Sequence, residues 1–337
     1  MSLEYCDSFD TYTTAQILRR YPNVPSGHSV MSIGTPGPSG LGQYIYSSGD
    51  YCAFLASITA RSEYYLGFDY KNIISNGQRF LTIQTSAGAT ICSFLDAGSI
   101  NTTFGNSAAG VINANIWQQI QIHLVISATV GVLVVKVDGV IVINLTGLNT
   151  GSTNIDQLNI GCEFSGNSSQ PKYANLWVFN TLGSHSNTWP TGRMKVQASM
   201  PAADGTYTNW TPNSGSNHYS RVSEAQADDD TTYNSTVTTG NKDSYGIDAI
   251  SGSPAHIHGV IVTAITRKTD VNSKNYQVFS KSGATETYSP DIAAALTYAS
   301  STQNGAASLL HTDDPNTGVE WTQANLNAIE VGAKVTL

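Results

Sequence analysis

The most regular hydrophobic pattern of the chain lies between residues 117 and 145. Isoleucine or leucine occupies every second position from 120 to 126, and these residues alternate with Gln119, Gln121 and His123. A period of two is typical of a β-strand with one buried face. The pattern therefore predicts a strand here, with the His123 side chain on its outer face.

Two runs rich in β-branched residues follow, 132–137 and 140–145, and only an Asp-Gly pair separates them. This is a strong hairpin signal, because both central residues of a type I′ turn need positive φ. Across that turn, the predicted partners are Val137 with Val140 and Val135 with Val142. Both faces of the hairpin are largely apolar, so we expect it to be covered on both sides.

Further short strands are predicted wherever apolar, aromatic or β-branched runs lie between clusters of Gly, Asn, Ser or Pro. In the first part of the chain these runs are 44–46, 51–58, 63–70, 80–84, 89–95, 158–164 and 173–180. Only Thr13 to Arg20 looks helical there, and it is short. Short strands without long amphipathic helices favour an antiparallel sandwich over alternating strands and helices.

The segment from Thr181 to Arg193 is the predicted linker, because its Gly, Ser, Asn and Pro residues favour turns and extended backbone. A chain of 337 residues is long enough for about two domains. We therefore place one domain at residues 1–182 and a second at residues 183–337. The fold class predicted is all-β, with two consecutive antiparallel β-sandwich domains of jelly-roll type and few short helices.

The second domain carries a weaker pattern. Residues 193–199 alternate Met194, Val196 and Ala198 with polar residues, which predicts a strand. A short helix is predicted at 322–329, with Thr322 as its N-cap. The other predicted strands are 257–266, 276–280 and 331–337, the last of which closes the final sheet.

The composition fits a protein whose surface is kept soluble by hydroxyl and amide groups. Apolar residues make up 40% of the chain, but charged residues only 12%, against about 25% in an average soluble domain. With 16 basic and 24 acidic residues the formal charge is -8, and no basic cluster exceeds a pair. Nucleic acid is therefore not an expected partner.

The chain also lacks the signals of a membrane protein. No apolar run approaches the ~20 residues that a membrane-spanning helix needs. The N-terminal residues show no basic segment followed by an apolar one, so a secretory signal is not expected. Cys6, Cys52, Cys92 and Cys162 form no CxxC pair. We expect reduced thiols buried in the core, with disulfides as the alternative.

Trp117 and the strand pair after it, up to Gly139, resemble the motif that marks concanavalin A-like and laminin-G-like jelly rolls. The resemblance covers about residues 5 to 180. It implies a fold and not an activity, because that fold is found in lectins, hydrolases and pure scaffolds.

The second half resembles a type of tailed-bacteriophage virion protein, in which the jelly roll is followed by a distinctive C-terminal module. The resemblance extends over nearly the whole of residues 173–337. The segments that carry it are 210–219, 228–233, 240–245, 314–318 and 321–332, with a short N-terminal counterpart at residues 8–12. It implies a protein of the tail, the tail tip or fibre, or the head decoration.

No catalytic constellation is apparent. Jelly-roll glucanases place their carboxylates on one strand as Glu-x-Asp-x-x-Glu, because glycoside hydrolysis needs two carboxyl groups beside the bond. That string is absent, and no Gly-x-Ser-x-Gly elbow surrounds any serine. The glutamates that stand outside such a pattern are Glu63, Glu163, Glu224, Glu286, Glu320 and Glu330. We expect no catalytic residue and no enzymatic activity.

Two clusters are candidate metal sites by residue type. The run 228–230 consists of three aspartates, which suit calcium, but adjacent carboxylates on an extended chain point in different directions. His256 and His258 would lie on one face of a strand and hold zinc only if a third ligand came from elsewhere. A turn and a solvent-facing pair explain these clusters better. We therefore expect neither a metal nor a cofactor.

The 17 tyrosines and five tryptophans include some in turn-rich segments, where an aromatic face can stack on a sugar ring. Most aromatic residues of β-sandwiches pack in the core instead. The binding candidates retained are Trp189, Trp210 and Tyr219.

The favoured function is that of a non-enzymatic structural component of a phage virion, assembled in the host bacterial cytoplasm. Its partners would be other virion proteins, and the resemblance to phage appendages implies a homo-oligomer, for instance a trimer. The alternative is a carbohydrate-binding module that recognises host surface glycans through the N-terminal jelly roll. A third hypothesis is a glycan-cleaving enzyme, but the sequence lacks the carboxylate motif that such an enzyme needs.

Overall fold

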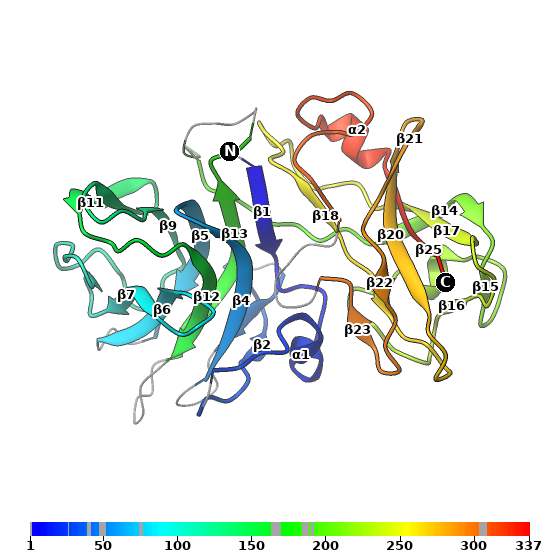
Figure 1. Ribbon diagram of the computed structural model, residues 1–337, viewed down its shortest axis with the longest axis horizontal. Helices are drawn as coiled ribbons and strands as arrows, with labels where there is room; N and C mark the ends of the chain where they lie inside the picture. The colour runs from blue at the N-terminus through cyan, green and yellow to red at the C-terminus, as the bar shows by residue number, and fades with distance from the viewer. Residues whose placement is uncertain are drawn as a thin grey trace. The chain divides into compact units, whose positions relative to one another are not determined.

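The computed structural model describes residues 2–25, 27–38, 42–46, 52–73, 77–162, 170–183, 189, 192–302 and 309–337, with only the backbone at residue 162. Within these residues the chain forms two compact units, the first extending to Val196 and the second beginning at Gln197 (Figure 1). Nearly all regular structure is antiparallel β-sheet, so the predicted all-β class with few short helices is confirmed. None of the described helices has the length and apolar character required to cross a membrane.

The first unit contains an eight-stranded antiparallel sheet, which we call sheet A. Its strands follow the order β11-β10-β9-β5-β13-β3-β2, and β1 pairs with β13 beside this path. Their bounds are β1 Ser2–Asp7, β2 Ser32–Gly34, β3 Tyr44–Tyr46, β5 Glu63–Lys71, β9 Gln118–Val125, β10 Gly131–Val137, β11 Val140–Leu148 and β13 Lys172–Asn180.

A five-stranded antiparallel sheet, sheet B, completes the first unit in the order β4-β12-β6-β7-β8. Its strands are β4 Cys52–Arg61, β6 Gln78–Gln84, β7 Thr90–Asp96, β8 Ile100–Thr102 and β12 Ile155–Cys162. One hydrophobic core joins side chains of both sheets, with Phe68 and Ile122 from sheet A and Phe54 and Phe94 from sheet B fully buried. The first unit is therefore a sandwich.

The predicted strands of the first unit all appear, with ends shifted by a few residues, and positions 163 and 164 lie outside the described residues. The predicted helix is a short 3₁₀ turn, η1 Thr14–Gln16, followed by α1 Ile17–Arg20. Strands β1, β2 and β8 were not predicted. Cys92 is a buried free thiol and Cys6 a half-buried one, as expected for reduced cysteines, and Cys52 is buried.

The hairpin of β10 and β11 forms as predicted, with Val137 opposite Val140. Asp138 and Gly139 both adopt positive φ, 49° and 82°, as a type I′ turn requires. The predicted pair of Val135 with Val142 is wrong. A β-bulge shifts the register, so that Ile143 lies opposite Val135.

The expectation that both faces of this hairpin are covered is also wrong for the single chain. Leu133, Val135 and Ile143 are buried against the core, but Val140 and Ile141 are 67% and 53% exposed. Strand β11 ends the order of sheet A, so its outer edge has no neighbouring strand among the described residues.

The second unit is built around a six-stranded antiparallel sheet, sheet C, in the order β14-β17-β25-β20-β21, with β22 beside β20. The strands are β14 Pro201–Thr208, β17 Lys242–Ile247, β20 Asn275–Ser282, β21 Thr285–Tyr288, β22 Ile292–Ala293 and β25 Glu330–Val335. The predicted C-terminal strand, β25, therefore lies inside the sheet between β17 and β20 and not at its edge. The predicted helix is α2 Gln323–Asn327, and the Thr322 hydroxyl caps it by accepting from the Asn325 N–H at 3.1 Å.

Three two-stranded sheets complete the second unit. Their strands are β15 Thr211–Pro212 with β16 Asn234–Ser235, β18 Val260–Val262 with β24 Leu309–His311, and β19 Ile265–Thr266 with β23 Ala299–Ser300. The strand predicted over 257–266 is thus two short strands, because its two ends pair with different partners.

The strand predicted at 193–199 does not form, and the structure shows why. The side chain of Gln119 binds the backbone of Met194 twice, donating from Nε2 to the carbonyl at 2.9 Å and accepting from the N–H at 3.0 Å. The Gln121 amide donates to the carbonyl of Gly192, and the Val196 N–H donates to Asn175. Side-chain amides on the outer face of sheet A therefore take the place of a strand partner for residues 192–196.

Candidate functional site

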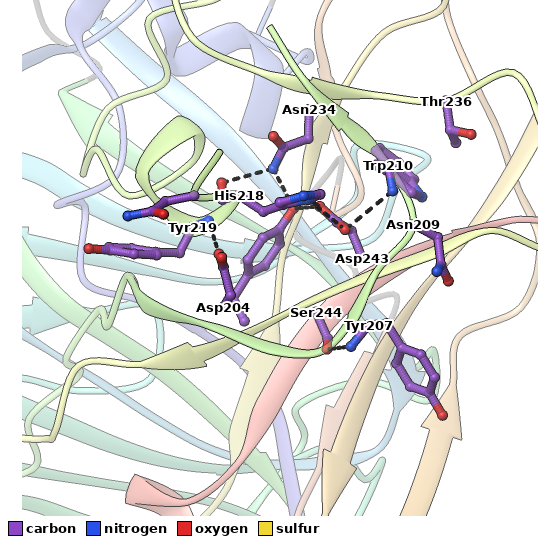
Figure 2. Close-up of polar contacts among 12 residues, drawn as sticks. Asp204, Tyr207, Asn209, Trp210, His218, Tyr219, Asn234, Thr236, Asp243 and Ser244 are labelled. Carbon is purple, nitrogen blue, oxygen red and sulfur yellow. Dashed lines mark hydrogen bonds and ion pairs between the residues drawn. The ribbon is translucent and has the colours of Figure 1, made fainter. Parts of the chain in front are cut away.

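The centre of the candidate site is a buried pair, His218 and Asp243, in the second unit (Figure 2). His218 precedes the 3₁₀ turn η3, Tyr219–Arg221, and Asp243 lies on β17. Nδ1 of the imidazole lies 3.0 and 2.9 Å from the two carboxylate oxygens, and the aspartate is only 1% exposed. The carboxylate therefore fixes the orientation and the tautomer of the ring, with the proton on Nδ1.

Further hydrogen bonds tie this pair to β16 and β17. The Tyr245 hydroxyl donates to Oδ2 of Asp243 at 2.8 Å, and the Asn234 amide donates to the Tyr245 hydroxyl and the His218 carbonyl, both at 2.9 Å. Burial, followed by the neighbouring Asp243 charge, raises the pKa of Tyr245, which stays a hydrogen-bond donor. This network is a rigid support for the loops on both sides of it.

The backbones of Trp210 and Tyr219, two of the predicted binding residues, each donate a hydrogen bond to an aspartate. The Trp210 N–H donates to Asp243 at 3.4 Å, and its indole N–H donates to the Asn241 carbonyl at 3.3 Å. The Tyr219 N–H donates to the carboxylate of Asp204 at 2.6 Å. Both side chains are partly exposed.

Figure 2 shows the two rings on opposite sides of the His218 and Asp243 pair. The structure therefore does not bring Trp210 and Tyr219 together into one aromatic platform. Neither ring makes an aromatic or cation–π contact with another described residue, and the Tyr219 hydroxyl has no hydrogen-bond partner among them.

Trp189, the third predicted residue, lies in the first unit and packs against other side chains. The rings of Tyr65 and His123 are stacked at 4.1 Å, and the Trp189 ring lies edge-on to both. The Lys136 ammonium lies 4.0 Å from the centre of the indole. These contacts occupy one face and an edge of the indole.

A charged aromatic cluster on one face of sheet C was not found from the sequence. Lys242 forms an ion pair with Glu286 at 2.7 Å and lies 4.4 Å from the centre of the Tyr207 ring. The hydroxyls of Tyr207 and Tyr288 also donate to the Glu286 carboxylate. Burial raises the pKa of Glu286, but these donors lower it more, to about 2. All the strong donors of this cluster have partners within the protein.

The glutamates considered as catalytic candidates have separate hydrogen-bond partners in the structure. Glu286 belongs to the cluster above, and Glu330 accepts hydrogen bonds from Thr206 and Ser244. Glu63 binds His123 at 2.8 Å, and position 163 lies outside the described residues. Among the described residues, no two of these glutamates contact each other or share a hydrogen-bond partner.

The two candidate metal clusters do not form ligand sets. Asp228 accepts from the backbone and hydroxyl of Thr232, whereas Asp230 binds Arg267 and Tyr298. The rings of His256 and His258 lie 6.0 Å apart, outside any strand, and His256 binds Glu320. Within the described ranges, no group of three His, Cys, Asp or Glu side chains is placed to hold a metal ion.

A search of protein-family models finds no match to the chain, and a search of curated proteins finds no relative. Solved structures overlap with it in part. A sialidase is 11% identical over 54% of this chain, with a TM-score of 0.40, and the chain spans 19% of that protein.

Two smaller structures overlap over most of their own length. A carbohydrate-binding module from Bacillus subtilis is 14% identical, and the overlap covers 47% of this chain and 100% of the module, with a TM-score of 0.30. An alginate lyase of polysaccharide lyase family 7 is 12% identical over 47% of this chain and 84% of the lyase, with a TM-score of 0.32. These overlaps include binding proteins and enzymes and assign no activity to this chain.

Proposed function

We propose that this protein is a non-enzymatic glycan-binding protein of a bacteriophage virion, and that Trp210 and Tyr219 each contact a sugar at a separate position on the second unit. The proposal rests on how these two rings are held and on which side chains surround them. Each is held at the surface by a backbone hydrogen bond to an aspartate, and no aromatic or cationic side chain of the described residues covers its faces.

A partly exposed aromatic ring on a rigid support suits sugar recognition. The apolar C–H face of a pyranose packs on such a ring, and binding costs little entropy because the ring is already held in place. The buried bonds of His218 and Asp243 supply that support. By contrast, the indole of Trp189 already carries the Lys136 ammonium on one face, so we assign Trp189 to packing.

The side chains around the two rings are of the type that binds sugar hydroxyls. Exposed amides and hydroxyls belong to Asn209, Asn213, Ser214 and Asn217. Amide groups donate and accept hydrogen bonds at the same time, which matches the two roles of a sugar hydroxyl. The proposal therefore moves the sugar site from the N-terminal jelly roll, where the sequence alone placed it, to the second unit.

The assignment to a virion rests on the resemblance of residues 173–337 to phage structural proteins. That resemblance extends over nearly the whole of residues 173–337, including the segment that carries Trp210 and Tyr219. Binding to host surface glycans would then be the work of a component that also contacts other virion proteins. A purely structural role in the particle is the second candidate function.

A glycan array probed with the full chain tests the proposal. We expect saturable binding to a subset of glycans, competed by the same free sugar. Tyr219→Ala or Trp210→Ala should weaken that binding about tenfold, the effect of losing one stacking contact. Both substitutions leave the His218 and Asp243 bonds in place. Tyr219→Ala should therefore change the melting curve little, whereas Trp210→Ala also removes the indole bond to the Asn241 carbonyl and should lower the melting temperature somewhat.

Tyr298→Ala is the matched control, because Tyr298 is also a partly exposed tyrosine of the second unit but is engaged by Asp230. It should bind the glycan as the unmodified chain does. Absence of saturable binding to any glycan would leave the purely structural role. Release of sugar fragments during the assay would instead establish an enzyme.

A further inference from the structure

Three side chains form a row across the outer face of sheet A, on β5, β13 and β3. Lys71 lies directly opposite Lys172, and Lys172 lies directly opposite Tyr46. On each strand an adjacent residue is buried in the core, namely Tyr70, Tyr173 and Ile45. Because successive side chains of a strand point to opposite faces, the row lies on the face away from the core.

Two more aromatic rings adjoin this row. The Tyr44 ring lies 5.6 Å from the Tyr46 ring and 5.7 Å from the ring of Trp117, the residue before β9. The Lys172 ammonium lies 4.8 Å from the centre of the Tyr44 ring. A Cβ at Gly34 would stand 2.5 Å from Cζ of Tyr44, so this ring rests directly on β2. We call the partly exposed set the tyrosine–lysine cluster, which consists of Tyr44, Tyr46, Lys71, Trp117 and Lys172.

The two lysines of this cluster lie opposite each other without a counterion. Like charges directly opposite on neighbouring strands destabilise a sheet. Lys172 donates to the Tyr44 hydroxyl at 3.4 Å, and Lys71 has no ion pair or hydrogen bond among the described residues. The indole N–H of Trp117 and the Tyr46 hydroxyl also have no acceptor among them. The cluster therefore combines positive charge and donors, and none of the described acids accepts from them.

The charged aromatic cluster of sheet C shows what partner such an arrangement takes. There Lys242 also lies against tyrosine rings, but Glu286 supplies a carboxylate that accepts from the ammonium and from two tyrosine hydroxyls. The tyrosine–lysine cluster has the same types of donor and lacks the acid. A carboxylate from another molecule would complete it in the same way.

We propose that the tyrosine–lysine cluster binds an acidic sugar, whose carboxylate lies between Lys71 and Lys172 and whose C–H face packs on Tyr46. Neighbouring strands lie about 4.8 Å apart, so one sugar ring reaches both the ammonium groups and the aromatic ring. A hexuronate carries a carboxylate and an apolar face on the same ring, whereas an acidic peptide side chain offers the carboxylate alone. This favours a sugar over an acidic protein.

The inference goes beyond the proposed function, because the cluster lies in the first unit and shares no residue with the rings of Trp210 and Tyr219 in the second. It therefore stands or falls independently of binding at those two rings.

Isothermal titration calorimetry of the full chain with a panel of hexuronate oligosaccharides tests the inference. We expect saturable binding to at least one of them, at least tenfold tighter than to the same oligosaccharide with its carboxylates reduced to alcohols. Added salt should weaken the binding of the acidic form, because it screens the attraction to the lysines. The inference is overturned if no hexuronate binds or if the acidic and reduced forms bind equally.

Two lysine variants locate the site. Lys71→Gln should weaken hexuronate binding about tenfold without lowering the melting temperature, because it also removes the repulsion with Lys172. Lys136→Gln is the matched control, since Lys136 is also a partly exposed lysine of the first unit but packs on Trp189 from β10. It changes the net charge equally and should bind as the unmodified chain does. Equal binding by the two variants would place the sugar elsewhere.

Tyr46→Ala separates a sugar from other anions. It should weaken hexuronate binding about tenfold, the effect of a lost stacking contact. If poly-glutamate binds as tightly as the hexuronate and Tyr46→Ala changes neither, the cluster is a surface for an acidic protein and the inference is wrong. Tyr219→Ala should leave hexuronate binding unchanged, so a failure of this site is distinguishable from a failure of the sugar contacts in the second unit.

Discussion

Gly67 of β5 lies directly under the indole of Trp177 on β13, so that a Cβ at position 67 would stand 2.4 Å from Cζ2 of that ring. The same Cβ would lie 2.8 Å from the Ile120 carbonyl. Only a glycine leaves this space, and the indole fills it with 1% of its surface exposed. The outer face of sheet A is therefore packed as closely here as a core.

Gly67→Ala should destabilise the first unit by about 2–3 kcal/mol, because neither the large ring nor the backbone carbonyl has room to move. Thermal melting followed by circular dichroism measures this. Gly192→Ala is the control, since a Cβ there meets nothing within 4 Å. Equal melting temperatures for the two variants would show that the ring shifts freely.

A second prediction follows from the contact of the Gln119 side chain with the Met194 backbone. Gln119→Met keeps the volume of the side chain but leaves the N–H and carbonyl of Met194 without partners. Two such bonds are worth about 1–3 kcal/mol together, so amide exchange in residues 192–196 should accelerate at least tenfold. Hydrogen–deuterium exchange with mass spectrometry measures the rate.

Gln84→Met serves as the control for that experiment. Gln84 donates to Gln157 at 2.7 Å on sheet B, away from the Met194 segment. Its replacement should leave the exchange of residues 192–196 unchanged. Equal exchange in the Gln119 and Gln84 variants would mean that this segment is held by other contacts, such as the ion pair of Arg193 with Asp69.

The same segment marks the limit of what the sequence predicts. The alternation from Ile120 to Ile126 and the Asp-Gly turn predicted strands β9, β10 and β11, because a half-buried sheet imposes a period of two on its own residues. Residues 193–199 show that period as well. They form no strand, since their partners are side chains of β9 and β13, which no local pattern encodes.

The candidate site was predictable only in part. The surface aromatics Trp210 and Tyr219 could be selected by residue type and by turn-rich context. Asp243 and His218 could not, because they lie 25 positions apart with no motif between them. Strand β17, which carries the aspartate, was missed because Lys242–Ile247 has too few apolar residues to show alternation.

Glu330 gives a prediction for acid stability. Burial raises the pKa of Glu330, but hydrogen bonds from Thr206, Ser244 and Lys281 lower it more, to about 2, from an ordinary value of 4.5. As pH falls below about 5, the unfolded chain takes up this proton before the folded chain does, so stability is lost between about pH 5 and pH 2.

Glu330→Gln should therefore lower stability at pH 7 by about 1–2 kcal/mol and should reduce the difference in melting temperature between pH 7 and pH 3. Asp291→Asn is the control, because Asp291 is exposed and its replacement tests whether the loss of any carboxylate changes the pH dependence of stability. If the melting temperature of Glu330→Gln changes with pH in parallel with that of the unmodified chain, the hydrogen bonds to this carboxylate do not contribute to stability.

Asp243 is expected to be the most sensitive residue of the second unit. Asp243→Ala leaves the buried Nδ1 of His218, the hydroxyl of Tyr245 and the N–H of Trp210 without their acceptor. Loss of a buried charged acceptor costs about 3–5 kcal/mol, and exchange should accelerate across residues 210–219. Asp204→Ala should cost less than about 1 kcal/mol, since this exposed carboxylate serves only the Tyr219 N–H among the described residues. If the two variants have the same melting temperature, the buried bonds of Asp243 do not support the loops that carry Trp210 and Tyr219. The rigid presentation of these rings would then need another cause.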